Sequence, residues 1–176
     1  HFHLSLQSGC DRTLKAMNRK YDTARFYEAM QLLRRFFPDC GMTCDVIVGF
    51  PGETERHQEE TLAFLKKARF SDAHIFPYSR RPGTPADKMD GHIDRATKAK
   101  RSKQARAVVA ETRRAFLESM IGKTLPVLFE TQDGENWQGH SDNYLEVRAE
   151  GENLRGTVHN VRINEVSDGI LVGNVI

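Results

Sequence analysis

Apolar residues in the first half of the chain form three short runs that predict β-strands. The runs are HFHLSLQ (1–7), residues 43–50 and AHIFPY (73–78). Helix-like segments separate them, and this alternation is typical of a parallel sheet covered by helices. Pro77 cannot donate a hydrogen bond to a sheet ladder, so we expect the third strand to lie at an edge of an open sheet.

Two of the intervening helices carry clear end signals. The helix predicted over 23–37 follows Asp22, a good N-cap residue, and stops before Pro38. Another helix begins after Thr54, with glutamates near its start and basic residues near its end, as the helix dipole favours. A shorter helical piece is expected around 11–19. The residues expected on the inner faces are Phe26, Met30, Leu33 and Phe37 in the first helix and Leu62, Phe64, Leu65 and Ala68 in the second.

After the third predicted strand, the sequence predicts a loop, a long helix and then several short strands with alternating apolar and polar residues. Residues 79–93 are predicted to be loop, and a long helix follows from about Asp94 to Ile121, ended by Gly122. Five short stretches with turn residues between them then predict a small all-β barrel. The fold class is therefore α/β over 1–121, followed by a β-barrel over 122–176. The five stretches are TLPVLFE, WQGHS, NYLEVRA, GTVHNVRIN and GILVGNV.

Charge divides the chain at the same place. Residues 1–121 hold 22 Lys and Arg against 15 Asp and Glu, a net charge of +7, and residues 122–176 hold 4 against 9, a net charge of −5. We expect a polyanion to contact the first part more than the second. No apolar run approaches the ~20 residues of a membrane span. Three cysteines without framework spacing favour a reducing, cytoplasmic setting.

The ends of the three predicted strands are candidates for a ligand site. Ligands of parallel α/β sheets bind where the carboxyl ends of the strands meet. Here the strands end in residues 7–9, 49–53 and 78–80, which are polar or glycine-rich. Glycine allows a close approach of the backbone, and Glu53 offers a hydrogen-bond acceptor. The alternative is a tight turn before a helix; there is no phosphate loop and no GxGxxG motif.

Three motifs in this order connect the chain to a known family. HLSLQSGCDRTLKAMNRKY (3–21), DVIVGFPGET (45–54) and FPYSRRPGTPA (76–86) closely resemble the radical-SAM tRNA methylthiotransferases. Residues 122–176 resemble TRAM, the small RNA-binding barrel that ends those proteins. The variants LSLQSGC and MNRKY are most similar to the subgroup that methylthiolates threonylcarbamoyladenosine beside the tRNA anticodon. Sister enzymes modify isopentenyladenosine or an aspartate of a ribosomal protein.

The resemblance implies a fold and a set of cofactors. The three strands would be the last part of an open, TIM-like barrel, and the cofactors would be S-adenosylmethionine and two [4Fe–4S] clusters. Arg19 would pair with the carboxylate of S-adenosylmethionine. The residues that the resemblance assigns to binding S-adenosylmethionine are Ser5, Gln7, Ser8, Arg19, Gly49, Phe50, Glu53 and Tyr78.

The cysteines of the chain depart from the family pattern. The cluster motif of the family is CxxxCxxC, whereas Cys40 and Cys44 are followed by Ile47 at the third position. We therefore expect the cluster cysteines to lie outside this chain, and Cys40 and Cys44 to be small core residues. His1 and His3 share a strand face and could bind a metal, but no third ligand is evident, so we expect a polar strand face and no metal site.

Basic residues are the candidates for contact with the tRNA backbone. For those on the long helix, the alternative is a solvated helix face. In the barrel, Trp137 and Tyr144 are the obvious aromatic residues for stacking on bases. The residues expected to bind RNA are Arg80, Arg81, Lys98, Arg101, Lys123, Arg148, Arg155 and Arg162.

Together these features predict part of a cytoplasmic tRNA methylthiotransferase whose partner is the tRNA anticodon stem-loop, with no membrane partner and a monomeric full-length protein. Because the chain starts within a predicted strand at His1, we expect an N-terminal portion to be missing. We expect no catalytic residue in this chain and no activity of the chain alone. The alternatives are a ribosomal-protein aspartate methylthiotransferase, a stand-alone RNA-binding module, and a structural piece that binds nothing.

Overall fold

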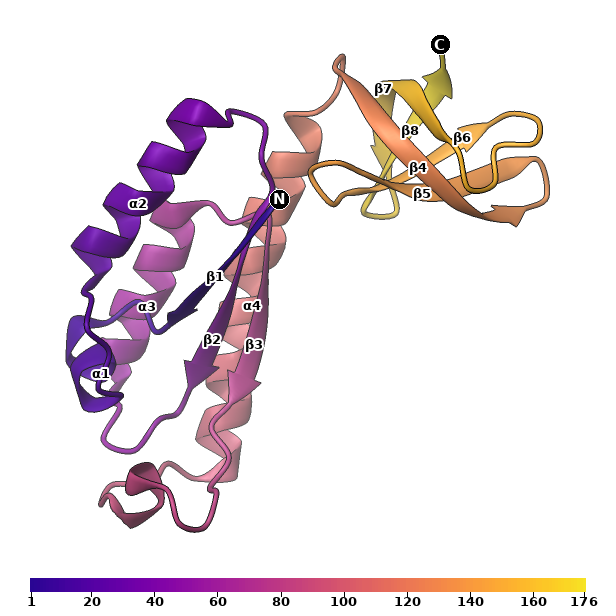
Figure 1. Ribbon diagram of the computed structural model, residues 1–176. Helices are drawn as coiled ribbons and strands as arrows, with labels where there is room; N and C mark the ends of the chain where they lie inside the picture. The colour runs from indigo at the N-terminus through magenta and orange to yellow at the C-terminus, as the bar shows by residue number, and fades with distance from the viewer. The chain divides into compact units, whose positions relative to one another are not determined.

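A parallel three-stranded sheet and a closed β-barrel are the two sheets of the computed structural model, which describes residues 1–176 (Figure 1). Contacts group the chain into two compact units. The α/β unit comprises residues 2–38 and 42–112, and the barrel unit comprises His1, 39–41 and 113–176. The division falls within the long helix that the sequence predicts, before the boundary expected at residue 121.

The α/β unit repeats strand and helix in the predicted order. The expected loop over 79–93 contains a short 3₁₀ helix, which the sequence did not predict. The long helix α4 begins in this unit and continues past Thr112. The elements are β1 Phe2–Gln7, α1 Asp11–Ala16, α2 Thr23–Phe36, β2 Met42–Val48, α3 Glu55–Ala68, β3 Asp72–Pro77, η1 Pro85–Lys88 and α4 Arg95–Glu118.

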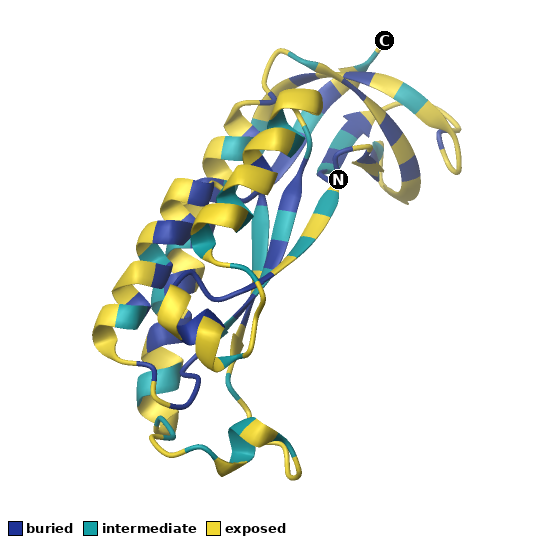
Figure 2. Ribbon diagram, turned by 60° about the vertical axis from the view of Figure 1, so that its left-hand side comes forward, coloured by how far each residue is buried: buried dark blue, intermediate teal, exposed yellow.

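The sheet has the order β1-β2-β3, and both strand pairs are parallel, as predicted. β3 is an edge strand, and Pro77 lies at its end, opposite Val48. The helices lie to one side of the sheet (Figures 1 and 2). Along β2 the buried residues Cys44, Val46 and Val48 alternate with half-buried ones, because successive side chains of a strand point to opposite faces. The sheet therefore has one covered face and one open face.

The helix starts predicted from the sequence are confirmed. The Asp22 side chain accepts a hydrogen bond from the Arg25 N–H, which caps α2. Thr54 caps α3 in a reciprocal arrangement with His57. On α2 the inner face is narrower than predicted: Met30 is buried, whereas Phe37 follows the end of the helix and is exposed.

The barrel unit contains the five predicted strands. The barrel has the order β4-β5-β6-β8-β7 and is closed by pairing of β4 with β7. Only β6 and β8 pair in parallel, and this is the Greek-key order of OB-like barrels. Its core includes Val127, Phe129, Val147, Val161 and Ile163. The strands are β4 Thr124–Asp133, β5 Asn136–Ser141, β6 Glu146–Glu150, β7 Val158–Ser167 and β8 Ile170–Val175.

None of the helices combines the length and apolar content that crossing a membrane requires. Gly122, predicted to follow the long helix, has a φ of +81°, in the left-handed region that glycine adopts most readily.

Candidate functional site

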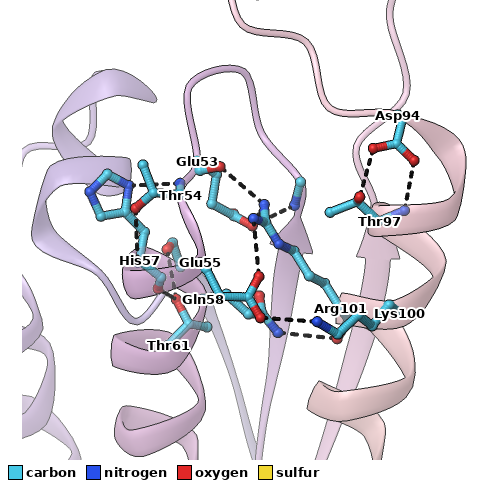
Figure 3. A network of polar contacts seen from close by, with 12 residues as sticks. Glu53, Thr54, Glu55, His57, Gln58, Thr61, Asp94, Thr97, Lys100 and Arg101 are labelled. Atoms are coloured by element: carbon cyan, nitrogen blue, oxygen red, sulfur yellow. Dashed lines mark hydrogen bonds and ion pairs between the residues drawn. The ribbon is translucent and has the colours of Figure 1, made fainter.

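A buried ion pair fastens the loop that follows β2 (Figure 3). The Glu53 carboxylate accepts hydrogen bonds from the Gly49 N–H at 2.9 Å and from Arg101 Nη1 of α4 at 2.8 Å. The same Nη1 also donates to the Glu53 carbonyl oxygen at 3.1 Å. Glu53 and Arg101 are only 5% and 4% exposed. The loop is therefore held in one conformation by contacts inside the α/β unit.

This pair changes two expectations from the sequence. Glu53 was expected to offer an acceptor at the rim of the site, but its carboxylate is buried and already bonded. Arg101 was expected to face RNA, but it is inside the unit, bonded to Glu53. The spacing of Arg101 with the buried residues Ala105 and Val109 is the signal that places it on the inner face of α4.

Burial and hydrogen bonding shift the pKa of Glu53 in opposite directions. Removal from water raises the pKa of Glu53, because burial disfavours the charged carboxylate. The Gly49 N–H and the Arg101 guanidinium lower the pKa of Glu53, since both stabilise the carboxylate. The first effect is the larger, so the pKa of Glu53 lies above its ordinary value.

Two glycines at the strand ends are required by packing within the chain. A Cβ at Gly9 would lie 2.7 Å from the Phe64 Cβ and 2.9 Å from the Thr61 Cα, both on α3. A Cβ at Gly49 would lie 2.3 Å from Lys98 Cγ, and the φ of Gly49 is +72°. The lack of a side chain at both positions allows close contact with helices, and the positive φ of Gly49 is a conformation that glycine adopts most readily.

A cavity of about 500 Å³ lies at the carboxyl ends of the strands, where the sequence predicts a ligand site. Gln7 from β1 and Tyr78 after β3, both predicted site residues, line it together. The Tyr78 hydroxyl is buried and has no hydrogen-bond partner. The remaining lining residues are Asp45, Ile47, Phe76, Pro77, Ser79, Arg81, Thr84 and Ala86.

Other predicted cofactor residues lie around this cavity or away from it. Phe50 is buried and packs edge-on against the Tyr78 ring, with ring centroids 5.3 Å apart. Ser5 is exposed on β1. Ser8 is buried, with its hydroxyl 3.3 Å from the hydroxyl of Thr61 on α3. Arg19 is exposed in the segment after α1. None of Ser5, Ser8 or Arg19 lines the cavity.

Several cavity residues were missed from the sequence. Asp45 is a charged residue in the middle of the apolar strand β2, which was the available signal. Ile47 and Phe76 lie in the apolar runs of β2 and β3, and the sequence does not show that one face of the sheet is open. Thr84 and Ala86 lie at the start of η1, and only the folded chain brings them to the strand ends.

Two of the predicted RNA-binding residues near the end of β3, Arg80 and Lys98, are held by hydrogen bonds within the chain. Arg80 donates to the Asp87 carboxylate at 2.9 Å and to the Asp87 carbonyl at 2.9 Å. Lys98 Nζ donates to the Tyr78 carbonyl at 2.9 Å. Arg81 is exposed and lines the cavity. Among the predicted RNA-binding residues of this unit, Arg81 is therefore the one that reaches the candidate site.

The predicted cations of the barrel are spread over several elements. Lys123 precedes β4 and pairs with Asp39. Arg148 lies on β6 and Arg162 on β7, and β8 runs between these two strands. Arg155 is exposed in the loop between β6 and β7.

The two barrel aromatics have different environments. Trp137 is 5% exposed in the barrel core and donates from Nε1 to the Gly151 carbonyl at 3.0 Å, so it is not available for stacking on a base. Tyr144 is 66% exposed and stacks on His140, with ring centroids 5.3 Å apart. His140 also lies 2.6 Å from the Glu130 carboxylate. Tyr144 is thus the exposed aromatic residue of the pair named from the sequence.

The environments of two cysteines argue against cluster binding. Cys44 is fully buried on the covered face of β2, and burial raises the pKa of its thiol well above the ordinary value. Burial also raises the pKa of the Cys10 thiol. Iron–sulfur clusters are bound by thiolates, and raised pKa values disfavour the thiolate. Cys10 and Cys44 are thus buried packing residues, as the sequence predicted for Cys44, whereas Cys40, also predicted to be a core residue, is only half-buried.

Comparisons with known proteins point to the same family as the three sequence motifs. A family model described as the radical SAM superfamily matches residues 1–65. A tRNA-2-methylthio-N(6)-dimethylallyladenosine synthase of Bartonella quintana (strain Toulouse) is 38% identical over 177 residues, which are 99% of this chain and 39% of that protein. A protein of the same name from Alkaliphilus oremlandii (strain OhILAs) is 39% identical over 180 residues, 100% of this chain and 38% of that protein.

A second kind of relative is similar to nearly the same degree. A threonylcarbamoyladenosine tRNA methylthiotransferase of Bacillus subtilis (strain 168) is 36% identical over 169 residues, which are 93% of this chain. The chain spans 38–39% of the length of these three relatives.

Proposed function

Because this chain is related along its whole length to the tRNA methylthiotransferases of the radical-SAM superfamily, we propose that it forms part of such an enzyme. The enzyme would attach a methylthio group to an adenosine of tRNA. The observation that carries the proposal is the cavity at the ends of three parallel strands, where Gln7 and Tyr78 meet. In parallel α/β folds this edge is where ligands bind.

The volume of the cavity and the polar groups around it support S-adenosylmethionine as its ligand. Its volume of about 500 Å³ lies within the range of about 300–1,000 Å³ of small-molecule pockets. The buried, unpartnered hydroxyl of Tyr78 needs a hydrogen-bond partner, and a polar ligand would provide one. Gln7 would orient the ligand, and Ile47 and Phe76 would exclude water. When bound, S-adenosylmethionine supplies radical chemistry together with two [4Fe–4S] clusters, whose cysteines we place outside this chain.

We propose threonylcarbamoyladenosine beside the anticodon as the acceptor, because the motif variants LSLQSGC and MNRKY are most similar to the subgroup that modifies it. The relatives named for dimethylallyladenosine are similar to this chain to nearly the same degree, so this adenosine is the second candidate. A ribosomal-protein aspartate is a third acceptor class, and a stand-alone RNA-binding module is the alternative without catalysis.

An acceptor assay tests these possibilities. The full-length gene product, with its clusters reconstituted under anaerobic conditions, is incubated with S-adenosylmethionine and with tRNA that carries either modified adenosine. Nucleoside mass spectrometry should detect the methylthio product of threonylcarbamoyladenosine. Product only from dimethylallyladenosine would contradict the acceptor assignment. Product only on ribosomal protein would contradict tRNA as substrate, and no product with any acceptor would favour a binding module.

Replacing Tyr78 by phenylalanine should weaken binding of S-adenosylmethionine. The change keeps the ring that packs on Phe50 and removes the unpartnered hydroxyl. Loss of one hydrogen bond should raise the dissociation constant by roughly two- to tenfold. Calorimetric titration of the reconstituted enzyme measures the effect. Tyr27→Phe, which changes a tyrosine on α2 that does not line the cavity, is the matched control, and equal affinities of the two variants would contradict the assignment.

The barrel unit supplies the surface that we propose for tRNA. OB-like barrels bind nucleic acid on the face of their second and third strands, which are β5 and β6 here. The outward residues His140 on β5 and Arg148 on β6 lie on this face, and Tyr144 lies in the turn between the two strands. Stacking on Tyr144 and contact of a phosphate with Arg148 would suit single-stranded nucleotides. The net charge of −5 limits this surface to these local contacts.

Tyr144→Ala should weaken tRNA binding, because it removes the exposed ring that stacks on His140. Loss of one base-stacking platform should raise the dissociation constant for tRNA about tenfold. Filter binding across a salt series measures this. Val158→Ala removes an exposed apolar side chain from β7 of the same barrel and should leave the affinity unchanged. If both variants bind like the wild type, the stacking surface lies elsewhere.

A further inference from the structure

Three side chains that can bind a metal meet on the open face of the sheet. His3 lies on β1, Asp45 on β2 and His74 on β3, so each of the three neighbouring strands contributes one residue. In the strand register Asp45 lies opposite His74, and His3 lies opposite Thr43, two residues before Asp45. Alternate residues of a strand share a face, so all three side chains project away from the helices. The sequence indicated His3 together with His1, whereas the structure groups His3 with Asp45 and His74, which are far away along the chain.

The distances within this group suit a small cation. One potential ligand atom from each residue lies within 4.8 Å of the other two. His3 Nε2 and Asp45 Oδ2 are 3.2 Å apart, and the rings of His3 and His74 have centroids 5.9 Å apart. Around a tetrahedral zinc ion with bonds of about 2.0–2.1 Å, neighbouring ligand atoms are about 3.3 Å apart. One edge of such a site is thus formed already, and rotation of the His74 side chain can complete it.

The three ligand residues, two histidines and one aspartate, also favour one kind of metal ion. Two imidazoles and one carboxylate are ligands typical of zinc sites that keep a position open, whereas magnesium and calcium prefer oxygen ligands alone. His3 Nδ1 lies 2.9 Å from the Thr43 hydroxyl. With Nε2 bound to a metal, Nδ1–H would donate to that hydroxyl, which is the outer contact that orients a metal-binding histidine.

An ion pair between His3 and Asp45 explains only part of the arrangement of these three side chains. The His3 and Asp45 side chains are 40% and 30% exposed, and a pair with this much access to water contributes little to stability. Such a pair gives no reason for His74 to approach from the third strand. A bound cation accounts for all three side chains together.

The site continues into the cavity at the strand ends, because Asp45 belongs to both. Three protein ligands leave at least one coordination position of zinc open, as in sites where the ion also binds water or a ligand atom. We propose that His3, Asp45 and His74 bind one divalent transition-metal ion, zinc by preference, with an open position toward the cavity. This proposal does not depend on the proposed methylthiotransferase function.

Metal titration of the purified, metal-free chain tests the proposal. Calorimetry with zinc chloride should give one site per chain, and cobalt chloride should give the visible absorption bands of cobalt in a site of low coordination number. His74→Ala and Asp45→Asn should each raise the dissociation constant for zinc by more than about tenfold. Thr43→Val, which removes the hydroxyl that makes the outer contact with His3, should raise it by about tenfold.

His159→Ala is the matched control, because His159 lies on β7 in the barrel and belongs to no such group. It should leave the zinc affinity unchanged, and far-UV circular dichroism checks that every variant is folded. The proposal is overturned if the wild-type chain binds no stoichiometric zinc. It is equally overturned if His74→Ala binds zinc as tightly as the wild type, since His3 and Asp45 would then be a simple hydrogen-bonded pair.

Discussion

Replacing Arg101 by alanine should lower the free energy of unfolding of the α/β unit by about 3–5 kcal/mol, because it leaves a buried carboxylate without its partner. The side chains of Arg101 and Glu53 are 5% and 2% exposed, and their ion pair is 2.8 Å long. Arg101 also donates to the Glu53 carbonyl, so the change releases the loop after β2 from α4. A loss of this size is a large part of the stability of a typical domain.

Urea unfolding followed by far-UV circular dichroism measures this loss. Lys100→Ala is the control on the same helix, since Lys100 forms an exposed pair with Glu55 and should contribute much less to stability. Replacing both Glu53 and Arg101 by apolar residues should cost less than the Arg101 change alone, because no unpaired charge then remains buried. Equal effects of Arg101→Ala and Lys100→Ala would show that the buried pair contributes no more than a surface pair.

The pH dependence of the Arg101 variant provides a second readout. Burial raises the pKa of Glu53, and Arg101 opposes this rise. A carboxyl whose pKa is raised on folding stabilises the fold below its unfolded pKa, and this contribution is lost as the pH rises through the folded pKa. Without Arg101 the pKa of Glu53 rises further, so the loss of stability should be larger at about pH 8 than at about pH 5. An equal loss at both pH values would contradict this account.

Gly139→Ala should destabilise the barrel unit by about 3 kcal/mol, the upper end of the usual cost of overpacking. A Cβ at Gly139 would lie 2.0 Å from the Leu128 carbonyl oxygen and 2.7 Å from the Phe129 Cα. Both atoms belong to the backbone of β4, so neither can move away without breaking the pairing of β4 with β5. Since the proposed tRNA surface includes β5, binding of tRNA should weaken in parallel.

Trp137 makes this measurement specific to the barrel, since it is the single tryptophan of the chain and lies in the barrel core. Its fluorescence during urea unfolding reports on this unit. Gly151→Ala is the matched control: its Cβ would meet Leu154 Cδ1 at 2.6 Å, the end of a flexible side chain that can rotate away. A cost below about 1 kcal/mol is expected for it. Similar midpoints for the two variants would mean that β4 shifts easily.

Local signals were sufficient to predict the α-helices and strands of both units, although not the short 3₁₀ helix η1. Asp22 and Thr54 start helices because their side chains bond to N–H groups a few residues away, and the structure contains both caps. Pro77 indicated an edge strand because it lacks a donor, and β3 is an edge strand. Only neighbours in the sequence are needed for these predictions.

The site could be predicted only in part. The parallel order placed Gln7 and Tyr78 at one edge of the sheet, and both line the cavity. Glu53 was expected at the same rim, yet it turns inward to Arg101. Trp137 was one of two aromatic candidates for stacking on a base, yet it is part of the barrel core. A polar or aromatic residue can lie on either side of a loop or strand, and its type alone does not determine which.

By itself the sequence determined the order of strands and helices, the family motifs and the edge at which the strands end. All of these depend on residue spacing and on residue types over short stretches. Which distant side chains meet depends on the folded chain: Glu53 meets Arg101, and His3 meets Asp45 and His74. These partners are separated along the chain by whole helices and strands, so their contact depends on the register of the sheet and the packing of α4.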